Sequence, residues 1–302
     1  MATQTFDIAA ARARESTASR GDWALLLIPG AIWGASFLFI AEGLKAVAPD
    51  GITFLRFLIG FASLAAVPGA RRPVEARDRA GIAWLGVIWL AFPMSMFPHA
   101  EQQVSSALTG MLNGAIPLIA TGVAAILARK APSRAVGGGL AVGFAGAALM
   151  ALAGLGAGTN SARGVLMISA ALVSYGVAIN LARPLQQRNG ALPVVWRALG
   201  VALILTAPLG APALLAAHWT ARSLLAVLAL GFLGTAVANV AMAAAAGRLG
   251  ATRASATTFL IPAVALLLGV AVRGERVGAV AVAGLGLCLA GAGLVRRATM
   301  RG

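Results

Sequence analysis

The sequence predicts an all-α membrane protein with ten transmembrane helices arranged as two inverted five-helix repeats. Of its 302 residues, 60% are hydrophobic and only 11% are charged, whereas soluble domains carry about a quarter charged residues. The segment from Val104 to Lys130 also recurs 145 positions later, as Leu249 to Glu275, and the shift places Pro117 on Pro262 without a gap. We therefore interpret the chain as two copies of one membrane unit.

A helix needs about 20 apolar residues to cross a bilayer, and ten runs approach or exceed this length. They are Trp23 to Ala41, Ile52 to Gly69, Gly81 to His99, Val104 to Ala128, Arg134 to Gly154, Gly164 to Ala182, Pro193 to Ala213, Arg222 to Ala244, Ala251 to Val272 and Val277 to Val295. The predicted organisation is a cytoplasmic tail (1–22), a first repeat (23–154) and a second repeat (163–297). Because five crossings are an odd number, the second copy enters the membrane from the opposite side. Inverted repeats are typical of secondary transporters.

The orientation follows from the distribution of Lys and Arg. If the amino terminus is cytoplasmic, 17 basic residues lie on that side and five on the other, with Arg56 and Arg197 inside spans. The positive-inside rule then places both termini in the cytoplasm. This asymmetry accounts for the net charge of +15, so no nucleic-acid partner is expected. The single cysteine, Cys288, lies in an apolar run, which excludes a disulfide or a cysteine metal site, and we expect no cofactor.

Several short motifs of the sequence resemble those of the drug/metabolite transporter superfamily, specifically its EamA-type members. They are IWGASF at Ile32 to Phe37, LRF at Leu55 to Phe57, Ile116-Pro117 in the fourth span, ASATTFLIP at Ala254 to Pro262 in the ninth, Gly274-Glu275, and the Gly/Ala/Leu closing spans. The resemblance covers nearly all of the chain after Asp22. It implies metabolite export across the bacterial inner membrane, with exporters of aromatic amino acids as the nearest relatives.

Polar and aromatic side chains inside spans are the candidate substrate ligands, since each needs an interior partner or a water-filled cavity. The candidates are Trp33, Ser36, Trp89, Met94, Thr109, Asn113, Tyr175, Asn180, Asn239, Met242 and Thr258. Asn, Ser and Thr would hold the amino and carboxylate groups, and the aromatic residues and Met would line an apolar wall. The alternative is that the polar groups only bond between helices and the aromatic rings only pack.

The charged residues of the spans lead to narrower expectations. Arg56 and Arg197 are related by the repeat, and we expect them to cap helix ends or to reach the membrane interface rather than to bind an anion. Glu42, Asp50, Glu101 and Glu275 all lie at span ends. A drug antiporter for cations needs a buried carboxylate in its spans, so that function is disfavoured. Any proton coupling would have to use an end residue such as His99 or Glu101.

The sequence therefore predicts an inner-membrane exporter or facilitator of small metabolites, above all aromatic and other apolar amino acids, working by alternating access. No catalytic motif is present, which argues against an enzyme. The expected partners are the amino acid and the lipid bilayer, with no obligatory protein partner. Two alternatives stay open: a channel-like pore for small solutes, and a carrier of phosphorylated metabolites or nucleotide sugars, which requires Arg56 or Arg197 to face the cavity.

Overall fold

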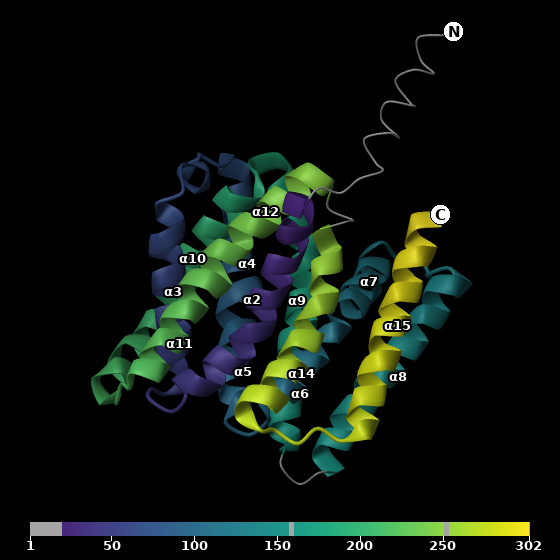
Figure 1. The fold of residues 1–302 in the computed structure, drawn as a ribbon. Helices are drawn as coiled ribbons and strands as arrows, with labels where there is room; N and C mark the ends of the chain where they lie inside the picture. Colours follow the sequence, from purple (N-terminus) through teal and green to yellow (C-terminus); the bar gives the residue numbers. More distant parts are fainter. Residues whose placement is uncertain (1–19, 157–159, 251–253, 302) are drawn as a thin grey trace.

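A computed structural model describes residues 20–156, 160–250 and 254–301. Within these ranges every regular element is helical (Figure 1). The predicted cytoplasmic tail lies outside the described residues as far as residue 19. The long elements of the first half are α2 (Arg20–Gly43), α3 (Pro49–Ala65), α4 (Arg79–Leu85), α5 (Phe92–Glu101), α6 (Ser106–Leu112), α7 (Ile116–Leu127) and α8 (Arg134–Gly156). Those of the second half are α9 (Ala162–Asn189), α10 (Ala191–Ala213), α11 (Ala221–Gly231), α12 (Ala238–Leu249), α14 (Leu260–Arg273) and α15 (Ala279–Arg301).

Nine helical runs in the described chain are long and apolar enough to cross a membrane. The predicted span from Ile52 to Gly69 corresponds to α3, which has 17 residues, at the lower end of the length that a crossing needs. The helix begins earlier than predicted because Pro49 suits its first turn, where the missing N–H costs nothing. It ends at Ala65, ahead of Pro68, which starts the 3₁₀ turn η1 (Pro68–Arg71). The tenth crossing stays a prediction.

Two irregularities recur at corresponding places in the two halves. A π-helical segment, η3 (Gly86–Ala91), joins α4 to α5, and η6 (Phe232–Val237) joins α11 to α12. A 3₁₀ segment, η4 (Asn113–Ala115), precedes Pro117, and η7 (Ser255–Phe259) precedes Pro262. Proline cannot donate to the carbonyl four residues earlier, and its ring crowds that carbonyl, so the helix tightens just upstream. The sequence repeat is thus matched by a repeat of local helix geometry.

Hydroxyl side chains set the start of several helices. Ser105, Ser161 and Thr220 accept hydrogen bonds from the first backbone amides of α6, α9 and α11, which satisfies donors that have no partner within the helix. Helix α9 ends at Asn189 rather than near Ala182 as predicted. Its polar end is held because the Arg188 guanidinium donates to Asp78, in the 3₁₀ turn η2 (Ala76–Asp78), at 2.7 and 3.0 Å.

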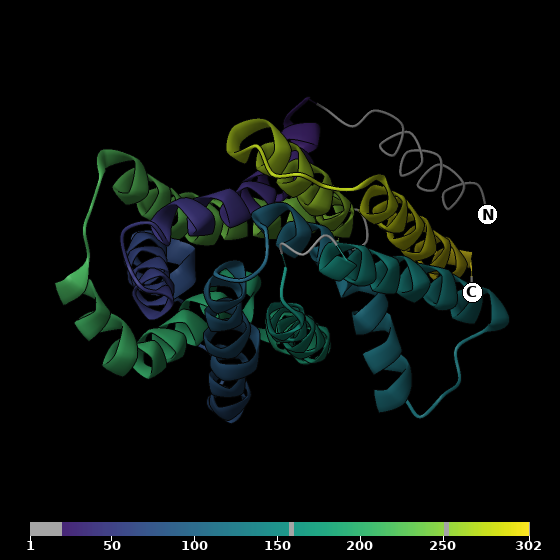
Figure 2. The ribbon, with the colours of Figure 1, turned by 90° about the horizontal axis from the view of Figure 1, so that it is seen from below.

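The buried side chains form two clusters that share α9. One includes Phe37, Phe97 and Met111, and the other includes Phe57, Leu85 and Leu199. The start of α2 and the end of α15 lie at the same end of the bundle (Figure 1). The most extensive helix pair is α8 with α15, which lies along one side of the bundle, away from α3, α10 and α11 (Figure 2). A Cβ on Gly284 of α15 would stand 2.8 Å from the Gly146 carbonyl of α8, so only glycine permits this approach.

Candidate functional site

Four polar or aromatic side chains converge on Gly234, in the π-helical segment η6. The Trp33 indole Nε1 donates to the Gly234 carbonyl at 3.0 Å. A Cβ on Gly234 would lie 3.0 Å from Ser36 Oγ and 3.8 Å from Arg56 Nη2. Arg56 Nε donates in turn to Thr235 Oγ1 at 3.2 Å. We call Trp33, Ser36, Arg56, Gly234 and Thr235 the Gly234 cluster; it joins both halves, and π-helical segments frequently occur at functional sites.

Arg56 lies inside the bundle, midway along α3, so it neither caps a helix end nor extends to the outer surface, which corrects the expectation from the sequence. The residue is only 6% exposed, and among the described residues only its Nε is hydrogen-bonded. Its repeat partner Arg197 behaves as expected of a structural residue: it is half-buried, donates to the Pro193 carbonyl of its own helix at 3.2 Å, and lies over the Trp196 ring. The repeat equivalence of the two arginines therefore does not extend to their surroundings.

A row of aromatic rings continues from the Gly234 cluster. Phe37, one turn after Trp33 on α2, meets Phe97 of α5 edge to face with ring centroids 5.8 Å apart. Phe97 stacks on Tyr175 of α9 at 5.9 Å. The sequence singled out Tyr175 and Trp33, but it did not single out Phe37 or Phe97, which look like ordinary core residues in a chain of this composition.

Glu101, the last residue of α5, has a buried carboxylate. Both of its carboxylate oxygens are shielded from solvent and have no hydrogen-bond partner in the described chain. Burying a charged or polar group without a partner is costly, so such a group in a folded protein requires an explanation. The sequence placed Glu101 at a span end, and the structure agrees, but its position gave no sign that the carboxylate would be enclosed.

A second group of charges lies at the end of the bundle where α2 and α14 end. The Glu42 carboxylate, whose side chain is 5% exposed, pairs with Lys45 at 2.8 Å, Arg222 at 2.8 Å and Arg273 at 3.1 Å. Arg273 also pairs with Glu275 at 2.9 Å. We call these five residues the Glu42 cluster. It ties α2 of the first half to α11 and α14 of the second.

Glu275 extends this cluster to the start of α6. Its carboxylate accepts from the backbone amides of Ser106 and Ala107 at 3.1 and 2.8 Å and from Ser106 Oγ at 2.7 Å. Burial by itself would raise the pKa of Glu275, but these donors and Arg273 bring it below the usual value of 4.5. A carboxylate at a helix amino terminus is favourable because it meets unpaired amides and the positive end of the helix dipole. Glu275 is therefore ionised and fully partnered.

Four of the remaining predicted residues hydrogen-bond to helix carbonyls. The amides of Asn113 and Asn239 donate to the Thr109 and Thr235 carbonyls one turn earlier, and Thr109 Oγ1 donates to the Ser105 carbonyl. Asn239 thus follows the Gly234 cluster along its helix. Asn180 bridges to another helix, because its Nδ2 donates to the Ala120 carbonyl of α7 at 2.9 Å. Roles of these residues in a site stay predictions.

The last four predicted residues form no hydrogen bond with the Gly234 cluster in the described part of the chain. Trp89 and Met94 are half-buried and pack against the second hydrophobic cluster. Met242 is half-buried on α12. Thr258 Oγ1 donates to the Ser255 carbonyl within η7 at 2.7 Å. Their role in a substrate wall stays a prediction.

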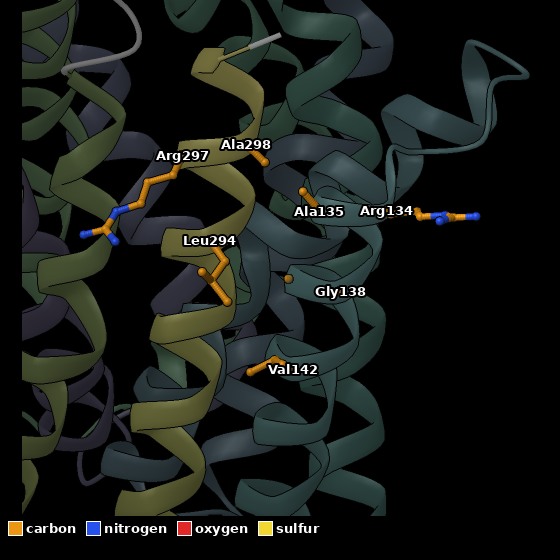
Figure 3. Close-up of a pocket in the computed structure, with 8 residues that line it drawn as sticks. Arg134, Ala135, Gly138, Val142, Leu294, Arg297 and Ala298 are labelled. Atoms are coloured by element: carbon orange, nitrogen blue, oxygen red, sulfur yellow. The ribbon is translucent and has the colours of Figure 1, made fainter.

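Two surface hollows lie along α15, away from these clusters. The first, of about 510 Å³, is lined by Arg134, Gly138, Val142, Leu294 and Arg297 among others. Figure 3 shows that Arg134 and Arg297 point away from it on opposite sides, so its lining is small and apolar. The second, of about 470 Å³, lies between α15 and Phe259. An apolar hollow between the outer helices of a membrane protein fits lipid chains better than a polar metabolite.

Comparison with known proteins gives the chain its family. The model of the EamA-like transporter family matches twice, over residues 22–152 and 162–297. The chain belongs to this family. The EamA-like chain is therefore a multi-pass membrane transporter, and its family members are transporters rather than enzymes.

Two relatives and one solved structure are similar to this EamA-like protein along most of their length. It is 29% identical over 287 residues to a protein of Streptantibioticus cattleyicolor named "Probable terminal-alkyne amino-acid exporter", covering 93% of this chain and 95% of that one. It is 25% identical over 243 residues to "Uncharacterized transporter YdfC" of Bacillus subtilis, covering 78% of each. A crystal structure titled only "Crystal structure of protein" matches with a TM-score of 0.64 at 21% identity, over 94% of this chain and 99% of that one; this likeness concerns the fold.

Proposed function

We propose that this EamA-like transporter exports or facilitates the passage of aromatic and other apolar amino acids. The observation that carries the proposal is that Trp33 of the Gly234 cluster and Phe37 of the aromatic row lie one turn apart on α2. A buried guanidinium, Arg56, suits a substrate carboxylate. Trp33, Phe37, Phe97 and Tyr175 supply the apolar wall that an aromatic side chain would contact. The Streptantibioticus relative is itself named as a probable exporter of a terminal-alkyne amino acid.

The mechanism we propose is alternating access between two inverted five-helix halves, 23–154 and 163–297, in the bacterial inner membrane with both termini cytoplasmic. Irregular π-helical and 3₁₀ segments at matching places in the two halves support it, because broken helices surround the midplane site of repeat-built transporters. Glycine contacts support relative movement: a Cβ on Gly139 would stand 3.0 Å from the Val295 amide. The partners are the amino acid and the bilayer, and no protein partner is required.

Flux measurements test this proposal directly. Purified protein in proteoliposomes should take up phenylalanine, tryptophan and leucine saturably, and substrate preloaded on the far side should accelerate uptake. Non-saturable flux without counterflow would instead indicate a channel-like pore. Asn239→Leu should reduce transport strongly without loss of folded protein, since Asn239 follows the Gly234 cluster on α12, and Asn113→Leu tests the other predicted amide. Undiminished transport in both variants would remove them from the site.

A carrier of phosphorylated metabolites is the second candidate, because Arg56 lies inside the bundle. A phosphate would find one buried guanidinium there. Saturable uptake of a phosphorylated sugar with no amino-acid flux would replace the amino-acid proposal by this one.

A further inference from the structure

Two residues of opposite charge face the interior of this transporter without pairing with each other. Arg56 bonds through Nε to Thr235, and the oxygens of Glu101 have no hydrogen-bond partner in the described chain. The described residues contain no ion pair between them. Lys and Arg side chains elsewhere pair with carboxylates at 2.6–3.1 Å, and no contact of this kind joins Arg56 to Glu101 in the described chain.

Glu101 lies one helical turn from Phe97, the middle ring of the aromatic row. It follows Phe97 by four residues on α5, and residues four apart lie on the same face of a helix. Phe97 contacts both Phe37 and Tyr175, and Phe37 lies one turn after Trp33, which belongs with Arg56 to the Gly234 cluster. The row of rings therefore has a guanidinium near one part of it and a carboxylate near another.

The neighbouring cations are already engaged. Glu275, Arg273 and Arg56 are the charged groups that act on Glu101. Glu275 repels it, Arg273 is bonded to Glu42 and Glu275, and Arg56 is bonded to Thr235. An enclosed carboxylate among engaged cations lacks a donor that the described chain itself supplies. A ligand that brings its own cation would provide one.

We propose that Glu101 receives the ammonium group of the substrate while Arg56 receives its carboxylate. This inference rests on the proposed amino-acid transport and adds its charge selectivity: the site takes zwitterionic α-amino acids. It disfavours phosphorylated substrates, because a phosphate dianion would meet the Glu101 carboxylate as well as Arg56, and like charges repel strongly where water is excluded. It equally disfavours amines that lack a carboxylate, since these leave Arg56 uncompensated.

Three ligands with the same phenyl ring distinguish the proposed contact of Glu101 from that of Arg56. Phenylalanine carries both charged groups, 3-phenylpropionate lacks the ammonium, and phenethylamine lacks the carboxylate. Glu101→Gln should weaken phenylalanine transport and binding by roughly thirtyfold or more, the usual effect of removing one partner of an enclosed charge pair. Competition by 3-phenylpropionate should stay the same or improve. Glu75→Gln is the matched control, because Glu75 is exposed and pairs with exposed Arg77. It should change neither the transport of phenylalanine nor the competition by 3-phenylpropionate.

Thermal stability provides a readout that does not depend on transport. Glutamine fits the same space and removes an unpartnered charge, so Glu101→Gln should be at least as stable as the wild type without ligand. Phenethylamine at high concentration should raise the Tm of the wild type and leave that of Glu101→Gln unchanged. The role of Glu101 would be overturned if the ratio of phenylalanine affinity to 3-phenylpropionate affinity were the same in the wild type and in Glu101→Gln.

Failure of the proposed function gives a different result. Wild-type protein would then neither bind nor transport phenylalanine. A phenethylamine-induced rise in Tm that Glu101→Gln abolishes would still support an ammonium site at Glu101. The absence of that rise in the wild type would overturn the site too.

Discussion

The Glu42 cluster and the two interior residues Arg56 and Glu101 are built from the same types of side chain, but they differ in how many partners those side chains have. Glu42 has three cationic partners and Glu275 has Arg273 and three donors from α6. Arg56 is also buried and the Glu101 carboxylate oxygens are shielded from solvent, but Arg56 has a single hydroxyl partner and Glu101 has no hydrogen-bond partner in the described chain. Where every charge is paired, the charges fix the ends of helices. Where they are not paired, burial of the groups destabilises the folded protein, and we propose that a bound substrate removes this destabilisation.

Arg56→Gln should show the largest effect of any single change. We expect transport of phenylalanine to fall about 100-fold or more, since a charge-assisted contact to the substrate carboxylate is lost in an enclosed site. Arg197→Gln, at the repeat-related position, should alter transport less than about twofold. Arg56→Lys retains the charge and should keep the protein folded with intermediate activity. Equal effects of the substitutions at positions 56 and 197, measured as kcat/KM in proteoliposomes, would contradict the distinction between them.

Glu42→Gln should chiefly reduce stability rather than substrate affinity. It removes the carboxylate that pairs with Arg273, whose side chain is only 26% exposed. Lys45 and Arg222 are mostly exposed, so their pairs with Glu42 contribute little to stability. We expect a loss of about 2 kcal/mol, seen as a lower Tm in detergent. The exposed pair of Glu75 and Arg77 supplies the control, for which a change below about 0.5 kcal/mol is expected. A stability loss for Glu75→Gln as large as that for Glu42→Gln would remove the role assigned to burial.

The pH dependence of stability should reveal Glu275. Its folded-state pKa is lower than its usual value of 4.5, so the unfolded chain binds a proton more readily than the folded one. The stabilisation is therefore fully present above pH 4.5 and is lost as the pH falls through the lowered pKa. The Tm of the wild type should drop in this acid range by more than that of Glu275→Gln. A Glu275-dependent drop between pH 6 and 8 would contradict the pairing described here.

Trp33→Phe should have the smallest effect on the interior. It keeps the ring and removes only the indole donor to the Gly234 carbonyl, which we expect to weaken transport about fivefold, the equivalent of one hydrogen bond of about 1 kcal/mol. Trp84, 64% exposed, offers the control: Trp84→Phe should leave transport unchanged. An effect of Trp33→Phe as large as that of Arg56→Gln would mean that positioning of η6, rather than charge, dominates the site.

The proline repeat illustrates what could be predicted locally. Pro117 and Pro262 lie 145 positions apart in the chain, and the structure has a 3₁₀ segment before each of them, although Pro29 and Pro184 lie inside continuous α-helix. Apolar runs located the helices, with shifts of a few residues where a polar pair such as Asp78 and Arg188 extends α9. The site was harder to predict. Ser36 and Trp33 were singled out as polar or aromatic residues in a span, whereas Phe97 and Glu101 matter through neighbours on α2, α9 and α14.

By itself the sequence determined a multi-pass membrane protein built from a repeated unit, because hydrophobic length and periodic similarity are properties of the chain in order. Only the tertiary structure decided which charges are satisfied. Arg56 and Arg197 hold equivalent places in the two copies, but Arg56 meets Thr235 from the other half and Arg197 meets the Pro193 carbonyl of its own helix. The energy of a charge in a membrane depends on its surroundings within a few ångströms, and helices far apart in the sequence supply those surroundings.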